Sequence, residues 1–254
     1  MDYIKFGEYP QTIKAQDVVV TDTCDERGYF VASDGCFYAK VKATPHEADF
    51  KFSTGETIIA GETYYFKVEP ICWRVLENKR GNAFILCENA IASHRFAQKS
   101  NNYAQSEIRQ WLNDDFLNKA FSPKEQKRIL VTNVDNSVAS TGYKENEYAC
   151  EDTQDKVFLM SHADITKMKY GFCASYSEEK NRMRVTSDYC RATGAHMVTE
   201  WQGYGNGYWW LRSPGDAKSF ARVRAVFGNG VSSYSYYYPD GDYGSVVPAM
   251  WIKF

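Results

Sequence analysis

The sequence lacks the short motifs that mark common metal, phosphate and nucleophile sites. It contains no CxxC pair, no HExxH, no GxSxG and no Walker loop. It also lacks any run of about 18 apolar residues, the length at which a membrane-spanning helix is recognised. These absences exclude a structural zinc module, a zincin, a hydrolase nucleophile elbow, a P-loop and a membrane-spanning helix.

Neither the start of the chain nor its cysteines reveal the cellular compartment. The opening MDYIKFGEYPQ has no basic segment followed by an apolar one, and Met1 is compatible with a start added after a targeting segment was removed. Cys72 and Cys87 lie in apolar strand-like runs, where cysteine acts as a small buried hydrophobe. Cys24 and Cys36 are candidates for a bridge across a hairpin, and their redox state stays open. The full set is Cys24, Cys36, Cys72, Cys87, Cys150, Cys173 and Cys190.

Net charge is small, which argues against a nucleic-acid partner. The chain has 30 Lys and Arg residues against 32 Asp and Glu, a formal charge of -2. No global basic field attracts a polyanion, and no acidic excess indicates disorder. Basic residues form only short clusters, such as 124–128 and Arg222–Arg224, which we interpret as solvated faces.

Aromatic residues, by contrast, are abundant. They make up 16% of the chain, with 19 tyrosines, and include the run SSYSYYY at Ser232–Tyr238. Tyrosine provides a large amphipathic contact with few torsions to freeze, and serine adapts its hydrogen bonding. This composition is typical of a binding surface. A Tyr-rich strand within a sheet is the alternative, because tyrosine also favours strands.

Strand signals dominate the first third of the chain. Short β-branched or aromatic runs predict strands at 37–41, 64–68, 71–76 and 84–87. A segment at about 18–66 has the pattern of a β-hairpin insertion between FGEYPQ and ICWRVLE. We predict a single α+β domain, 1–254, with short antiparallel strands and a few short helices.

Helix signals lie in the middle of the chain. Four serines are expected to begin helices, and the second opens a capping box, SPKE, with proline at the first helical position. The last of these helices is expected to end near Gly194. The segment 133–155 reads as a long polar loop. The four serines are Ser106, Ser122, Ser161 and Ser187.

The last quarter is predicted to return to β structure. Turn signals occur at 228–230 and 239–241, and 245–254 reads as an apolar strand. Alternation along 221–227 places Arg222 and Arg224 on one face. The same argument along the Tyr-rich run places three tyrosines beside Ser232. We therefore expect arginine and tyrosine together on one exposed surface.

Other candidate sites are weaker. Gly203–Gly207 resembles a phosphate loop but leads into a strand, so the anion-binding helix terminus is missing, and we interpret it as a flexible loop. Asp240 and Asp242 have the spacing of a calcium-loop fragment without its other ligands, and we interpret them as part of a turn. We expect no metal and no cofactor. Isolated histidines, read as surface or capping residues, are His46, His94, His162 and His196.

Taken in order, several segments resemble a known bacterial family. They are FGEYPQ, ICWRVLE, FILCENAI, SEIRQWLNDDF, KEQKRI, VFLMS, WWLRSPG and VPAMWI. They resemble the C-type lectin fold of the formylglycine-generating-enzyme-like subtype, and within it the variable proteins of diversity-generating retroelements of the Treponema type. The resemblance implies that a reverse transcriptase misreads template adenines and rewrites the 3′ end of the gene. AAC codons then become codons for Tyr, Ser and Asp, among others, on an exposed ligand site.

The resemblance places a variable ligand-binding region at about 209–251. The candidate ligand-binding residues are Asp216, Lys218, Phe220, Arg222, Arg224, Phe227, Asn229, Ser232, Ser233, Tyr234, Tyr236, Tyr237, Tyr238, Asp240, Asp242 and Tyr243. The expected scaffold residues are Trp209, Trp210, Arg212, Pro214, Val223, Gly228, Pro248 and Trp251. One departure from the related pattern is Val247, where arginine is expected.

The resemblance implies a non-enzymatic, receptor- or adhesin-like protein at the bacterial cell surface or in the periplasm. Its ligand would be an unidentified protein or glycan on another cell or host. Membrane attachment would come only from a lipid anchor absent from this chain. The alternatives are a formylglycine-generating-type oxidase or a lectin of fixed specificity. The oxidase chemistry uses C-terminal cysteines, whereas the last cysteine here is Cys190, and the EPN and QPD sugar motifs are absent.

Overall fold

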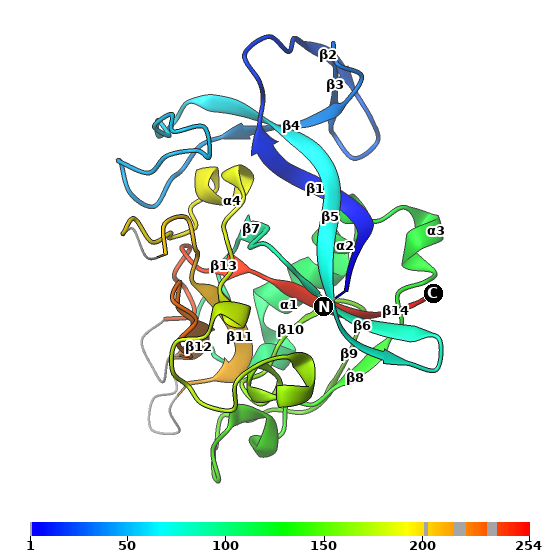
Figure 1. Ribbon diagram of the computed structural model, residues 1–254, viewed down its shortest axis with the longest axis vertical. Coiled ribbons are helices and arrows are strands. Elements are labelled where there is room, and N and C mark those ends of the chain that lie inside the picture. Colours follow the sequence, from blue (N-terminus) through cyan, green and yellow to red (C-terminus); the bar gives the residue numbers. More distant parts are fainter. Residues whose placement is uncertain (1, 201–202, 216–221, 233–237) are drawn as a thin grey trace.

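One long strand, β5 (Thr63–Lys79), organises the larger sheet of the computed structural model, which describes residues 2–200, 203–215, 222–232 and 238–254. β1 (Tyr3–Ile13) pairs antiparallel with one edge of β5. Along the other edge, β4 (Phe37–Lys42) pairs with the first part of β5 and β6 (Asn82–Cys87) with the last part. The larger sheet therefore continues in two directions from β5 (Figure 1).

The sequence predicted two strands where β5 is continuous. The predicted strands ended at Val68 and began again at Ile71, so the predicted break fell at Glu69-Pro70. Proline has no N–H group to donate to a sheet ladder. In the structure Pro70 is exposed and lies opposite Glu8, where the register of β1 shifts by a bulge. The bulge accommodates the missing N–H group, so the strand passes through the proline.

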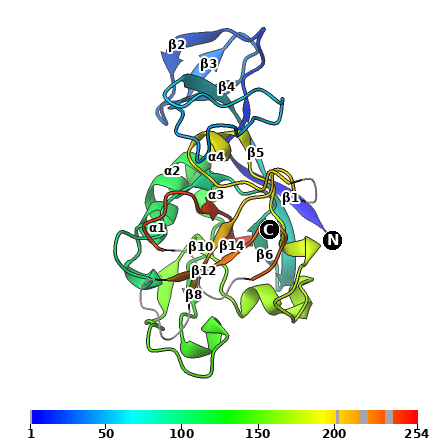
Figure 2. The ribbon, with the colours of Figure 1, turned by 90° about the vertical axis from the view of Figure 1, so that its left-hand side faces the viewer.

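The remaining strands extend the larger sheet at both ends. β3 (Phe30–Ala32) and β2 (Val20–Cys24) follow β4, and these three strands form a lobe that projects beyond the rest of the molecule (Figure 2). At the other end, β14 (Pro248–Lys253) pairs with β6, and β10 (Phe158–Leu159) pairs with β14.

A smaller sheet carries the C-terminal region. Its order is β12 (Val223–Val226), β11 (Trp209–Pro214), β13 (Ser245–Val246) and β7 (Ala92–Ser93). β11 and β13 are parallel, whereas the other pairs are antiparallel. The predicted last strand is thus divided at Val247 between two sheets. A separate ribbon joins β8 (Thr132–Val134) to β9 (Thr153–Asp155), both inside or beside the segment predicted as a loop.

The helices are short, and three of the four predicted serine caps are confirmed. The hydroxyls of Ser106, Ser122 and Ser187 accept hydrogen bonds from backbone N–H groups in the first turns of their helices. Ser161 exchanges hydrogen bonds with Asp164, but a 3-10 turn follows instead of an α-helix. The helical segments are η1 (Tyr103–Gln105), α1 (Glu107–Trp111), the π-helical η2 (Leu112–Phe116), α2 (Leu117–Ala120), α3 (Pro123–Gln126), η3 (Val138–Thr141), η4 (Asp164–Thr166), η5 (Met168–Tyr170), η6 (Lys180–Arg182) and α4 (Asp188–Ala192).

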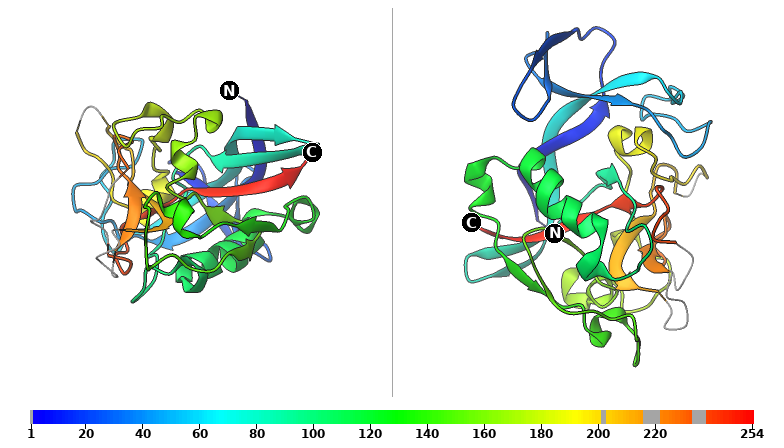
Figure 3. Two further views of the ribbon diagram at one scale, coloured as in Figure 1. Left: turned by 90° about the horizontal axis from the view of Figure 1, so that it is seen from below. Right: turned by 180° about the vertical axis from the view of Figure 1, so that it is seen from behind.

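Helical segments pack against β1 of the larger sheet, and the view from behind shows them in front of that sheet (Figure 3). Tyr9 of β1 lies with its ring centroid 5.1 Å from that of Phe116, and Phe6 lies 5.3 Å from Phe121. Burial of such aromatic side chains supplies much of the packing energy. The arrangement is α+β, with mostly antiparallel strands and helices segregated from them, as the sequence predicted.

The cysteines are all thiols in this structure. Cys87 is buried as predicted, whereas Cys72 is only half-buried, and Cys24 and Cys36 are not bridged. Over the described parts of the chain, no helix has the length and apolar character needed to cross a membrane.

Candidate ligand-binding site

The first strand of the predicted variable region, β11, is anchored deeply in the protein. All six residues of β11 are buried, including the predicted scaffold residues Trp209 and Trp210. The Trp209 indole donates to the carbonyl of Arg182 at 3.0 Å, and the Trp210 indole donates to the carbonyl of His94 at 2.8 Å. These bonds satisfy the polar ends of two large buried rings and leave β11 little freedom.

A buried ion pair also fixes β11. Arg212 donates to Asp164 at 2.8 Å and to the carbonyl of Leu159 at 2.7 Å. Burial by itself raises the pKa of Asp164, but the charges of Arg212 and Lys167 outweigh it, so the pKa lies well below its usual range. The pair ties the smaller sheet to η4.

We expect Asp164→Asn to destabilise the protein by about 2 kcal/mol at pH 7, because it leaves the buried Arg212 without its counter-charge. A carboxylate whose pKa is depressed on folding stabilises the protein above its unfolded pKa of about 3.9, and this contribution fades as pH falls further. Denaturant unfolding at pH 7 and pH 3 should therefore show a smaller gap between wild type and variant at pH 3. The exposed control Asp22→Asn should show little change. A gap that is equal at both pH values would contradict the prediction.

The predicted ligand-binding residues divide into groups. Tyr238, Asp240 and Asp242 are exposed on the connection between β12 and β13 of the smaller sheet. Those that are half-buried are Arg222, Phe227, Asn229 and Tyr243. Those that lie outside the described residues are Asp216, Lys218, Phe220, Ser233, Tyr234, Tyr236 and Tyr237.

Exposure was wrongly predicted for Arg224 and Ser232. Arg224 is fully buried and its Nη1 lies 2.8 Å from Nδ1 of His162, which is also 3.1 Å from the hydroxyl of Ser232. The guanidinium also lies 4.4 Å from the ring centroid of Tyr143. The segment that carries Tyr143 and His162 covers the face of β12 that alternation assigned to solvent. Alternation shows which side chains share a face, but not what covers that face.

His162 was expected at the surface or at a helix cap, and it is instead in the core. Burial, followed by the charges of Arg224 and Arg182, lowers its pKa to about 3. The imidazole is therefore neutral, and its Nδ1 accepts from Arg224 while Nε2 carries the proton. Gly142 makes room for this ring, because a Cβ there would lie 2.1 Å from Cδ2 of His162.

Buried arginine organises the neighbouring loops. Arg182 is fully buried and donates to the carbonyls of residues in three segments, 173–177, Ile165 and Gly230. Charged donors bind carbonyls more strongly than neutral ones. The loop before η6 is thereby tied to the predicted Gly228-Asn229-Gly230 turn, which the structure confirms through a hydrogen bond from Gly230 to Phe227.

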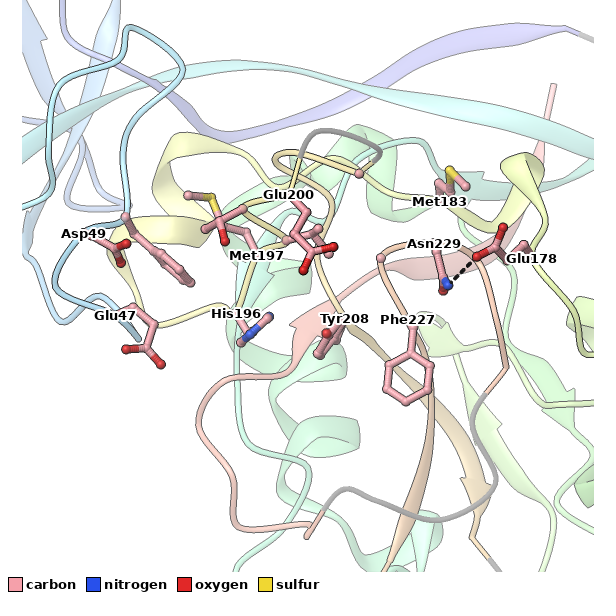
Figure 4. A pocket seen from close by; sticks show the side chains of 15 residues that line it. Glu47, Asp49, Glu178, Met183, His196, Met197, Glu200, Tyr208, Phe227 and Asn229 are labelled. Atoms are coloured by element: carbon pink, nitrogen blue, oxygen red, sulfur yellow. Dashed lines mark hydrogen bonds between the residues drawn. The ribbon is translucent and has the colours of Figure 1, made fainter.

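A cleft of about 780 Å³ opens beside this turn (Figure 4). Phe227 and Asn229 belong to the predicted ligand-binding set and line it, but sequence reasoning missed most of its other residues. They come from the 43–62 connection, from the residues on either side of η6, and from the segment between α4 and β11. No local motif unites them. The lining residues are Glu47, Asp49, Phe50, Glu178, Met183, His196, Met197, Val198, Thr199, Glu200, Gly203, Tyr208, Phe227, Gly228 and Asn229.

His196 lies inside this cleft and not on an open surface. Its ring stacks on Tyr208 with centroids 4.4 Å apart and an interplanar angle of 15°. Burial and then the neighbouring His46 lower the pKa of His196, so its ring is neutral at neutral pH. The cleft can therefore present aromatic faces and carboxylates to a bound group.

One comparison with known proteins gives a match. A family model described as a domain of unknown function (DUF6273) matches residues 80–254. The match includes the smaller sheet and the Gly228–Gly230 turn, while Glu47, Asp49 and Phe50 of the cleft precede it. No curated protein and no solved structure matches the chain.

Proposed function

The chain belongs to the DUF6273 family, whose function is unknown, and we propose that it is a non-enzymatic ligand-binding protein with a C-terminal region diversified by a retroelement. In this proposal the fold is the formylglycine-generating-enzyme-like form of the C-type lectin fold. The protein acts at the bacterial cell surface or in the periplasm, on a protein or glycan of another cell or host.

One observation carries the proposal: exposed residues of the C-terminal region lie between strands that are deeply buried. We call these strands, β11, β12 and β13, the buried frame. β11, β12 and β13 are buried throughout, whereas Tyr238 between them is 53% exposed. A rigid scaffold with adaptable, solvent-facing residues is how binding loops vary without loss of the fold. Tyrosine and aspartate at such positions offer amphipathic and polar contacts to a ligand.

Burial refines the set of residues proposed to vary. Tyr238, Asp240 and Asp242 can change side chain with little effect on packing. Arg224 and Ser232 hold His162, so we group them with the buried frame in this proposal.

The oxidase alternative is less well supported. Reactive cysteines are thiolates in electropositive, accessible surroundings. Cys190 is the most C-terminal cysteine, and burial raises its pKa to about 12. It remains a thiol at neutral pH and is a poor nucleophile.

DNA sequence tests diversification directly. The DNA near the gene is sequenced and searched for a near-copy of the part that encodes residues 211–254, beside a reverse transcriptase gene. The proposal expects differences at template adenines, concentrated in codons such as those of Tyr238 and Asp240. Absence of any such copy would overturn diversification and leave a fixed binding surface.

A library of variants tests whether the exposed residues can change without loss of the fold, and it needs no knowledge of the ligand. Tyr238, Asp240 and Asp242 are randomised together, and folded protein is selected by resistance to proteolysis. Most members should fold, because surface substitutions usually change stability by no more than about 0.5 kcal/mol. A matched library at Trp210, Arg212 and Arg224 should be almost devoid of folded members. Equal depletion of the two libraries would show that the exposed residues are structural.

A further inference from the structure

The acidic aromatic cleft allows the ligand chemistry to be specified. Its walls come from parts of the chain far apart in sequence, which Figure 4 shows converging around His196 and Tyr208. Glu47 and Asp49 lie on one side, Glu178 and Asn229 on the other, and Glu200 above the rings. A cavity assembled in this way exists only in the folded protein.

Aromatic rings form the lining between these walls. Tyr208 stacks on His196 on one side and meets Phe227 edge-to-face on the other, with centroids 5.1 Å apart. Phe50 approaches His196 at 6.0 Å from the opposite wall. Ring faces attract cations through their quadrupoles. A neutral His196 adds aromatic surface without a repelling charge.

The rim is acidic, although the whole chain is nearly balanced in charge. Glu47, Asp49, Glu178 and Glu200 line the cleft, and no Lys or Arg is among its described lining residues.

The rim carboxylates differ in how they are held. Asn229 donates to Glu178 at 2.9 Å, which orients that carboxylate, while Glu47 lies 3.6 Å from the imidazole of His46. The carboxylates of Asp49 and Glu200 make no hydrogen bond or ion pair with described residues, so both can accept from a ligand.

We propose that the cleft binds an organic cation of the type of a lysine or arginine side chain, presented by a protein ligand. The inference rests on the proposed ligand-binding function and names the chemistry of its partner. The ammonium or guanidinium group is bound by the rim carboxylates through charge-assisted hydrogen bonds. Its methylene stem packs against Tyr208, Phe227 and the methionines of the wall.

A metal ion fits this cleft less well. Among the described residues, no group of three or more His, Cys, Asp or Glu side chains is close enough to hold one. The rim carboxylates instead surround an opening lined by rings. That spacing suits a larger cation with an apolar body.

The test uses a fluorescein-labelled tetralysine peptide and the full chain, with fluorescence anisotropy at low and physiological salt. The double variant Asp49→Asn/Glu200→Gln removes two rim charges. Asp22→Asn/Glu26→Gln removes two exposed charges on the β2–β3 hairpin, outside the lining of the cleft, and serves as its matched control. Tyr208→Leu removes a ring from the lining, and Tyr204→Leu removes an exposed ring outside it. Labelled tetraserine measures non-specific binding.

We expect tetralysine to bind and tetraserine not to bind, with weaker binding at higher salt. The rim double variant should weaken binding about tenfold, since two partly exposed ion pairs are lost. Tyr208→Leu should weaken it about threefold, the value of one cation–π contact. Both control variants should stay within about twofold, and they and the rim double variant should keep the wild-type unfolding midpoint. Tyr208→Leu loses ring contacts with His196 and Phe227, so its unfolding midpoint should fall, and its binding is measured well below that midpoint.

Two results would overturn the inference: no binding of tetralysine, or equal weakening by the remote double variant, which would indicate a general charge effect. Either result leaves the diversification proposal intact, because that proposal is decided by the template copy and the exposed-residue library. Conversely, absence of a template copy would overturn diversification but would leave the expected binding of tetralysine in the cleft unchanged.

Discussion

Replacement of Arg182 by methionine is expected to lower the free energy of unfolding by about 4 kcal/mol, and the unfolding midpoint by about 10 °C. Arg182 is fully buried and supplies hydrogen bonds to five backbone carbonyls. Methionine fills similar space but donates nothing, so these carbonyls lose their donor, and those of Ile165 and Gly230 are buried away from water. Differential scanning calorimetry and denaturant titration measure the change.

The matched control is Lys180→Met, which places the same residue on the exposed end of the same short helix. It should change stability by no more than about 0.5 kcal/mol. If Arg182→Met is as mild as this control, the loops before η6 do not depend on the buried guanidinium. The cleft should respond as well, because Arg182 connects the wall that carries Glu178 to the turn that carries Asn229.

The second large effect is expected for Gly230→Ala, at about 3 kcal/mol or more. Gly230 has φ +81°, a conformation that alanine adopts only with strain. A Cβ at this position would also lie 2.1 Å from the carbonyl oxygen of Glu179. Both the turn and the loop facing it would have to move.

Gly35→Ala separates the two causes. Gly35 has φ +74°, but a Cβ there meets no atom within 4 Å. This variant should therefore show the conformational cost alone, about 1 kcal/mol. The difference between the two alanine variants measures the close approach at Gly230. Equal losses of unfolding free energy in the two variants would show that the loop at Glu179 moves aside without a measurable cost.

Local signals were predicted well because local physics decides them. A serine cap needs only an N–H group in the first turn of its own helix, and Ser122 with Glu125 makes both bonds of the predicted box. The turn at Gly228–Gly230 likewise needs only a few consecutive residues with the right backbone freedom. Strand β6 was recognised from its short apolar run bounded by turn signals.

Burial of charged residues was predicted poorly. Arg182 and Arg224 resemble solvated arginines in the sequence, since nothing nearby marks a partner. Their acceptors are loop carbonyls and His162, far away along the chain. His196 was read as a surface histidine for the same reason, because Tyr208 and Phe50 reach it only after folding.

The sequence by itself determined the α+β class, the helix starts, the turns and the Ser- and Tyr-rich composition of the C-terminal region. These depend on backbone preference, capping and side-chain periodicity, which act over a few residues. Only the tertiary structure decided that β12 is covered on both faces, that Arg182 holds the loops, and that four acidic residues surround one aromatic cleft. Such features depend on which distant segments meet, and long-range packing selects those contacts through the energy of the whole fold.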